Sequence, residues 1–144
     1  MALVTQLHGC GASLWRECSQ AGQALEIVRT PTPVQLVLSD VAMPEMRGTQ
    51  LVTEVLQLSP QTAGLLMTGD VGSLPDVPEG VTVIRKPFSP AELILAVRST
   101  LVRSAELYRR MRELTERNKQ LKSELQGAVE KSIETRERSS DTCR

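Results

Sequence analysis

The chain has 144 residues, of which 40% are hydrophobic, and its 17 Asp and Glu balance its 17 Lys and Arg. With one Trp, one Tyr and one Phe it must build an aliphatic core, and its length allows one domain plus an appendage. It has neither the roughly 18 apolar residues of a membrane span nor a signal-peptide pattern at the amino terminus. We therefore expect a cytoplasmic protein with no membrane contact, whose Cys10, Cys18 and Cys143 are reduced thiols, because they lack metal-ligand spacing.

The zero net charge conceals two unlike regions. Residues 1–100 carry six Lys and Arg against nine Asp and Glu, whereas residues 101–144 carry eleven against eight. We expect a domain over residues 1–100 and a helical extension over residues 101–144. Basic and acidic side chains alternate in the extension, so we do not expect it to bind DNA directly.

The first part of the chain predicts a helix end, a strand and a second helix. Residues 1–11 have leucines four apart, which is typical of one helix face. Residues 13–18 predict a short strand, and residues 20–28 a helix that ends at the proline-rich turn 30–33. This alternation is typical of an α/β protein.

Three apolar runs then predict parallel strands. Residues 34–40 form an uninterrupted run of the kind that is buried on both faces of a parallel sheet. Residues 63–67 and 81–85 are similar runs, and residues 48–58 between the first two have the spacing of an amphipathic helix. Residues 69–80 are rich in Gly and Pro, which favours a loop.

Each of these strands ends at a side chain with a polar group. Asp40 closes the first run, Thr68 follows the second and Lys86 follows the third. Open α/β sheets place their chemistry at the carboxyl ends of their strands. A carboxylate can attack a phosphoryl donor, a hydroxyl and an ammonium can hold the phosphoryl oxygens, and the set therefore predicts an aspartyl-phosphate site.

These segments resemble the receiver domain of two-component response regulators. The similarity lies in Leu38-Ser39-Asp40-Val41-Ala42-Met43-Pro44, Met67-Thr68-Gly69-Asp70 and Arg85-Lys86-Pro87-Phe88, in that order, and covers about residues 1–100. It implies a flavodoxin-like parallel sheet with strand order 2-1-3-4-5. The interval from Thr68 to Lys86 is shorter than is usual in the family, so a shrunken or missing fourth helix is expected.

The resemblance also implies roles for individual residues. Asp40 would be the phosphoacceptor, Thr68 the switch hydroxyl, Lys86 the phosphate-pairing amine, and the backbone carbonyl of Ala42, with Asp40, a ligand of Mg2+. The partner would be a histidine kinase or a phosphotransfer protein. Such a domain is not an enzyme beyond its own phosphotransfer and autodephosphorylation.

Two departures from the family pattern affect this site. The family's acidic pair closes a first strand that would fall ahead of Met1, so we expect an N-terminally truncated sheet with Asp40 as its one metal carboxylate. Mg2+ should then bind weakly unless Asp70 or Glu45 replaces the missing pair. Val83 also occupies the place of the family's switch aromatic.

Three readings of the function stay open at this point. The chain could be a receiver that is phosphorylated on Asp40 and signals through its last helix. It could instead be a phosphorylation-deficient pseudo-receiver that acts as an interaction or dimerisation module. It could also be a fragment from a misplaced start.

The last helix is expected to begin at Ser89-Pro90-Ala91-Glu92, which has the pattern of a capping box. Leu93, Val97 and Leu101 then form an apolar stripe, and no Gly or Pro occurs between Ala91 and Gly127 to end the helix. Apolar residues continue at heptad spacing, with Leu at position d and Asn at one position a. They are Leu107, Met111, Leu114, Asn118, Leu121 and Leu125.

This heptad row has two explanations. It could form a homodimeric parallel zipper, in which Asn118 fixes the register, or it could be an amphipathic helix that is exposed or folds back on the domain. Arg117 would face Lys122 of a parallel copy, which disfavours the zipper, but we expect self-association. Beyond Ser132 the polar tail is expected to fray.

Overall fold

The computed structural model describes residues 1–7, 13–69 and 77–141 of the chain. Three residues named in the sequence analysis, Cys10, Asp70 and Cys143, lie outside these ranges. The chain divides into two compact units, Met1–Tyr108 and Arg109–Arg144. Within the described ranges, no helix combines the length and the apolarity that crossing a membrane requires.

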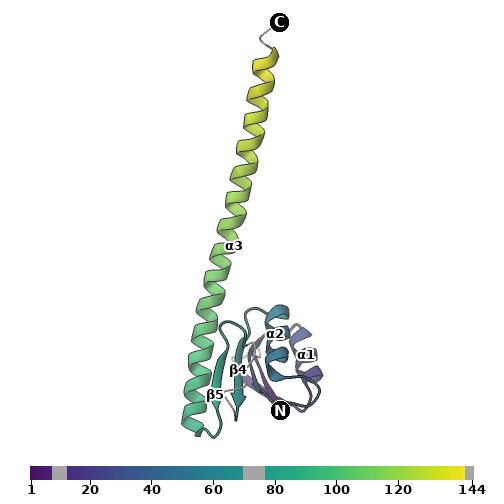
Figure 1. The fold of residues 1–144 in the computed structure, drawn as a ribbon, viewed down its shortest axis with the longest axis vertical. Coiled ribbons are helices and arrows are strands. Elements are labelled where there is room, and N and C mark those ends of the chain that lie inside the picture. Colours follow the sequence, from purple (N-terminus) through teal and green to yellow (C-terminus); the bar gives the residue numbers. More distant parts are fainter. Residues whose placement is uncertain (8–12, 70–76, 142–144) are drawn as a thin grey trace. The chain divides into compact units, whose positions relative to one another are not determined.

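The first unit is built on one five-stranded sheet with the order β2-β1-β3-β4-β5 (Figure 1). The strands are β1 (Ala2–Leu7), β2 (Ser13–Cys18), β3 (Val34–Asp40), β4 (Ala63–Thr68) and β5 (Thr82–Arg85). The helices are α1 (Ala21–Arg29), α2 (Gly48–Leu58) and α3 (Pro90–Asp141), the last of which continues into the second unit.

The order and type of the elements from residue 13 onward agree with the sequence analysis. The predicted strands and helices between residues 13 and 85 are all present, and their bounds differ by a residue or two. β3, β4 and β5 run parallel, which confirms the flavodoxin-like, receiver-type fold class. The described part of 69–80 contains no helix, as expected for a loop.

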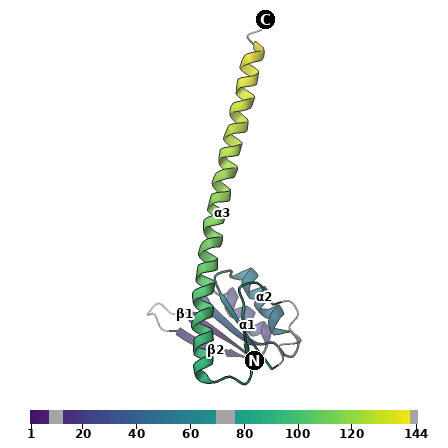
Figure 2. The same ribbon diagram turned by 60° about the vertical axis from the view of Figure 1, so that its left-hand side comes forward.

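The prediction for the amino-terminal residues is wrong. Residues 2–7 are not the end of a helix but β1, which lies inside the sheet between β2 and β3 and pairs antiparallel with both (Figure 2). Ala2 and Val4 are fully buried on one face, while Leu3 packs on the other. This alternation with a period of two residues is the pattern of a β-strand. Backbone hydrogen bonds to the edge of β3 favour the strand over the helix that the spacing of the two leucines suggested. The sheet is therefore mixed rather than parallel, and the position between β2 and β3 is occupied.

Helices cover both faces of the sheet (Figure 1), and an apolar layer lies between the sheet and the helices on each face. α1 and α2 pack on one face, where Leu25, Leu51 and Val55 join side chains from β1 and β3. The first turns of α3 pack on the opposite face, where the expected stripe of Leu93, Val97 and Leu101 is confirmed. β3 contributes side chains to both layers, Val34 and Val37 to the first and Leu36 and Leu38 to the second, which explains its nearly continuous apolar sequence.

The start of α3 shows the expected capping box. The backbone N–H of Glu92 donates to Ser89 Oγ at 3.2 Å, and the backbone N–H of Ser89 donates to Glu92 Oε2 at 2.7 Å. These bonds satisfy donors that a helix start leaves unpaired. At its other end α3 continues as far as Asp141. The fraying expected beyond Ser132 stays a prediction.

Candidate functional site

The parallel strands bring the predicted site residues to one edge of the sheet. Asp40 is the last residue of β3, Thr68 is the last residue of β4, and Lys86 follows β5 directly. In the strand register Asp40 lies opposite Met67, and Thr68 lies opposite Arg85. The backbone N–H of Lys86 also donates to the carbonyl of Thr68 at 2.7 Å, which ties the ends of β4 and β5 together.

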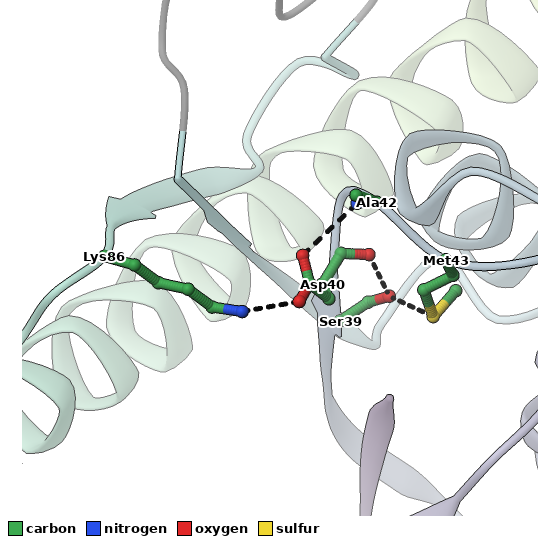
Figure 3. A network of polar contacts seen from close by, with 5 residues as sticks. All are labelled: Ser39, Asp40, Ala42, Met43 and Lys86. Carbon is green, nitrogen blue, oxygen red and sulfur yellow. Dashed lines mark hydrogen bonds and ion pairs between the residues drawn. The ribbon is translucent and has the colours of Figure 1, made fainter.

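Asp40 and Lys86 form an ion pair at this edge (Figure 3). Lys86 Nζ lies 2.5 Å from Asp40 Oδ2, and the backbone N–H of Ala42 donates to Asp40 Oδ1 at 3.2 Å. The side chain of Asp40 is 23% exposed and that of Lys86 is 41% exposed. Both carboxylate oxygens therefore have a donor, yet solvent reaches the pair.

The surroundings of Asp40 favour its ionised form. Partial burial removes water and by itself raises the pKa, but the hydrogen bonds from Lys86 and Ala42 and the charge of Lys86 outweigh it. The pKa of Asp40 is therefore held below its ordinary value. At neutral pH this residue is a carboxylate, which is the protonation state that a nucleophile requires.

The loop after Asp40 is held by groups that the sequence analysis did not single out. Ser39 is fully buried, and its hydroxyl contacts the Asp40 carbonyl oxygen at 3.0 Å and Met43 Sδ at 3.4 Å (Figure 3). The backbone N–H of Gly48 donates to the carbonyl of Val41 at 3.0 Å. A Cβ at Gly48 would lie 2.1 Å from the Asp40 carbonyl oxygen, so only glycine fits there.

The other residues predicted for the site lie outside the ion pair of Asp40 and Lys86. Thr68 is 5% exposed at the end of β4, one strand away from Asp40. Ala42 contacts the Asp40 carboxylate through its N–H. Val83 packs against the apolar layer under α1 and α2, where an aliphatic side chain replaces the family's aromatic residue. The Lys86–Pro87 peptide bond is cis.

The described residues do not fit a Mg2+ site. The strand beside Asp40 is β1, and because it runs antiparallel its first residues lie at this edge, where the backbone N–H of Asp40 donates to the Met1 carbonyl at 3.1 Å. β1 has the sequence ALVTQL and carries no carboxylate. No group of three or more His, Cys, Asp or Glu side chains that could hold a metal occurs in the described parts of the chain. A hard divalent ion needs several oxygen ligands, and Asp40 alone does not supply them.

Comparison with known proteins agrees with this geometry. The model of the family described as response regulator receiver domain matches residues 2–98. The chain belongs to this family. A comparison with curated proteins finds no match.

Solved receiver structures share the fold. The signal receiver domain of an HD domain-containing protein from Pseudomonas fluorescens Pf-5 is 29% identical, with a TM-score of 0.54 over 63% of this chain and 70% of that one. A CheY-like response regulator receiver domain from Methanospirillum hungatei JF-1 is 25% identical, with a TM-score of 0.51 over 60% of this chain and 72% of that one. An adenylate cyclase structure from Rhodopirellula baltica is 21% identical over 68% of this chain and 76% of that one, with a TM-score of 0.58, which shows the fold alone.

Receivers as a family accept phosphoryl groups in two-component signalling, and this receiver keeps part of the matching geometry. The carboxylate and the ammonium meet at the expected edge, and a buried threonine ends the strand between them. The strand beside β3, β1, runs antiparallel to it and lacks acidic residues. This edge of the sheet thus combines the carboxylate and the ammonium with a neighbouring strand that carries no carboxylate.

Proposed function

We propose that this receiver accepts a phosphoryl group on Asp40 from a histidine-phosphorylated partner, a histidine kinase or a phosphotransfer protein. The contact between Lys86 Nζ and Asp40 Oδ2 supports this function most directly. It places a cation beside an ionised, solvent-accessible carboxylate at the carboxyl ends of the parallel strands β3, β4 and β5. Neither group is needed there by the apolar core.

The transfer follows from the charges at the site. A carboxylate oxygen of Asp40 attacks phosphorus, the bond from phosphorus to the donor nitrogen breaks, and the donor imidazole keeps the electron pair and takes a proton. Lys86 moves from the carboxylate to the phosphoryl oxygens, whose charge it offsets, and Thr68 provides a hydroxyl donor at the same edge. No step is assigned to a metal, because the described residues do not fit one.

The proposed output runs through α3. Lys86 is followed by Phe88, which packs in the same apolar layer as Leu93 and Val97 of this helix. Moving Lys86 toward a phosphoryl group therefore acts on the chain segment that leads into α3. This coupling is part of the proposal.

Covalent labelling with acetyl phosphate tests the proposal. We expect label on the parent protein, no label on Asp40→Asn, and at least about tenfold slower labelling of Lys86→Ala, since one charged contact to the transferred group is lost. Glu26→Gln is the control, because it removes an exposed carboxylate of α1 that has no part in the site, and it should label normally. Label that persists on Asp40→Asn would exclude the assignment.

The acid-free β1 favours a second function, that of a phosphorylation-deficient receiver which acts by binding other proteins. Titration of the labelling reaction with Mg2+ separates the two functions. The first predicts slow labelling with at most a weak response to millimolar Mg2+. The second predicts no label at any Mg2+ concentration, although the protein is folded by circular dichroism.

A further inference from the structure

The unit Arg109–Arg144 presents an apolar seam along α3. The seam consists of Met111, Leu114, Asn118, Leu121 and Leu125, spaced alternately three and four residues apart. The four apolar side chains are 45%, 63%, 48% and 66% exposed, in chain order. Apolar surface in such a regular row is the surface with which helices pair in coiled coils.

The positions beside the seam carry mostly basic side chains. With Met111 at position a, the flanking e and g positions carry Arg110, Thr115, Arg117, Lys122 and Glu124, of which three are basic and one is acidic. The outward positions b, c and f are balanced instead, with Arg112, Lys119, Glu113 and Glu116. The e and g positions set the choice of partner in coiled coils. The flanks therefore favour a partner with acidic side chains.

A second copy of this chain matches the seam poorly. In a parallel pair, Arg117 of each copy faces Lys122 of the other. Neither Arg110 nor Glu124 faces a residue of opposite charge in such a pair. In an antiparallel pair, position a faces position d, so Asn118 would lie opposite Leu114 or Leu121. The Asn118 amide would then lose water without gaining a partner, which is unfavourable.

We infer that the seam binds an acidic amphipathic helix of another protein. The partner helix lies parallel to α3, carries Glu or Asp at its e and g positions, and has an Asn opposite Asn118. Arg117 and Lys122 then each face a carboxylate, and the two amides satisfy one another. This inference does not depend on phosphorylation of Asp40.

Binding of two designed peptides to the full chain tests the inference. Both peptides copy residues 108–128 with Asn at the position that faces Asn118; one has Glu at every e and g position and the other has Lys. We expect the Glu peptide to bind at least about tenfold more tightly than the Lys peptide, since several flanking pairs change sign together. The difference should shrink as salt is added, because exposed charges are screened.

Charge-reversal variants locate the effect. Arg117→Glu with Lys122→Glu should reverse the preference, so that the Lys peptide binds more tightly. The control variant, Arg112→Glu with Lys119→Glu, makes the same change in net charge at the outward position b. This variant should bind the Glu peptide more tightly than the Lys peptide, as the parent does. Circular dichroism of both variants checks that the helix is retained.

Three results would overturn the inference. The first is equal or absent binding of the two peptides to the parent chain. The second is a parent dimer in sedimentation that Leu114→Asp with Leu121→Asp dissociates, because the seam would then bind a second copy. The third is tighter association with anionic phospholipid vesicles than with the Glu peptide, because a basic amphipathic helix can also bind lipid.

Discussion

At the scale of single residues, the pair of Asp40 and Lys86 determines how the site responds to pH. A carboxyl group whose folded-state pKa is lowered stabilises the fold above its unfolded pKa, and this contribution disappears as pH falls through the folded pKa. The unfolded reference value for Asp40 is 3.8. The stabilisation is therefore complete at neutral pH and is lost below pH 3.8.

The Asp40→Asn variant measures this contribution. Because the pair is partly solvated, we expect the variant to be less stable than the parent by under about 1 kcal/mol at pH 7. The difference should shrink in the acid range below pH 3.8, as the parent carboxylate is protonated. Urea unfolding of both proteins at pH 7 and at pH 3 or lower gives the two differences. A difference that does not change with pH would contradict an ionic origin.

Gly48 is the second residue on which the site depends. An added Cβ would overlap the Asp40 carbonyl oxygen, which is backbone and cannot turn away. We expect Gly48→Ala to lower the free energy of unfolding by about 2 kcal/mol or more. Gly22→Ala is the control, because no atom lies within 4 Å of its added Cβ in α1. That substitution should raise stability by roughly 0.5–1 kcal/mol through helix propensity.

The residues proposed to react could be predicted from the sequence, whereas the residues that hold the backbone around them could not. Asp40, Thr68 and Lys86 each end an apolar run, and parallel strands bring such ends together without further information. Ser39 looks like one more residue of the β3 run, and Gly48 looks like an ordinary helix start. Their importance comes from contacts with the backbone around Asp40, and only the folded chain shows these contacts.

At the scale of the elements, β1 shows where sequence patterns fail. Its six residues are compatible with a helix face and with strand alternation, and a segment this short cannot decide between them. The open edge of β3 decides, because a paired strand satisfies backbone groups that would otherwise be buried without partners. β3 itself was predicted with its full bounds, since seven residues of nearly continuous apolar character leave no such ambiguity.

Thr5 tests the packing of β1. Its hydroxyl oxygen is buried and has no hydrogen-bond partner, so Thr5→Val removes an unsatisfied polar group without changing shape. We expect stability to rise by about 1 kcal/mol.

Thr62→Val is the matched control for Thr5→Val. The Thr62 hydroxyl donates to the carbonyl of Val34 at 3.0 Å, and the residue is fully buried. The same substitution should therefore lower stability there, by about 1–2 kcal/mol. Thermal or urea unfolding of the two variants gives the comparison, and destabilisation by Thr5→Val would argue against a buried β1.

At the scale of the whole molecule, the two units should be separable. The apolar layers of the first unit use α3 only as far as Leu101, and that unit ends at Tyr108. We expect a chain that stops after Tyr108 to keep its thermal midpoint within a few degrees, because no core contact is removed. Its helical circular dichroism signal should fall. A truncated chain that does not unfold cooperatively would show that the second unit is needed for the core.

The direction of β1 also has a consequence for the order in which the receiver folds. β1 and β2 are consecutive in the chain and pair along their whole length, so an inner strand and an edge strand meet through short-range contacts. Hairpin pairs of this kind form in about 1–10 μs, whereas β3 can pair with β1 only after the chain closes a longer loop that contains β2 and α1. We expect the β1–β2 pair to form first and β3 to dock on it later. The residue that carries the chemistry, Asp40, would then reach its place only when that slower docking step is complete.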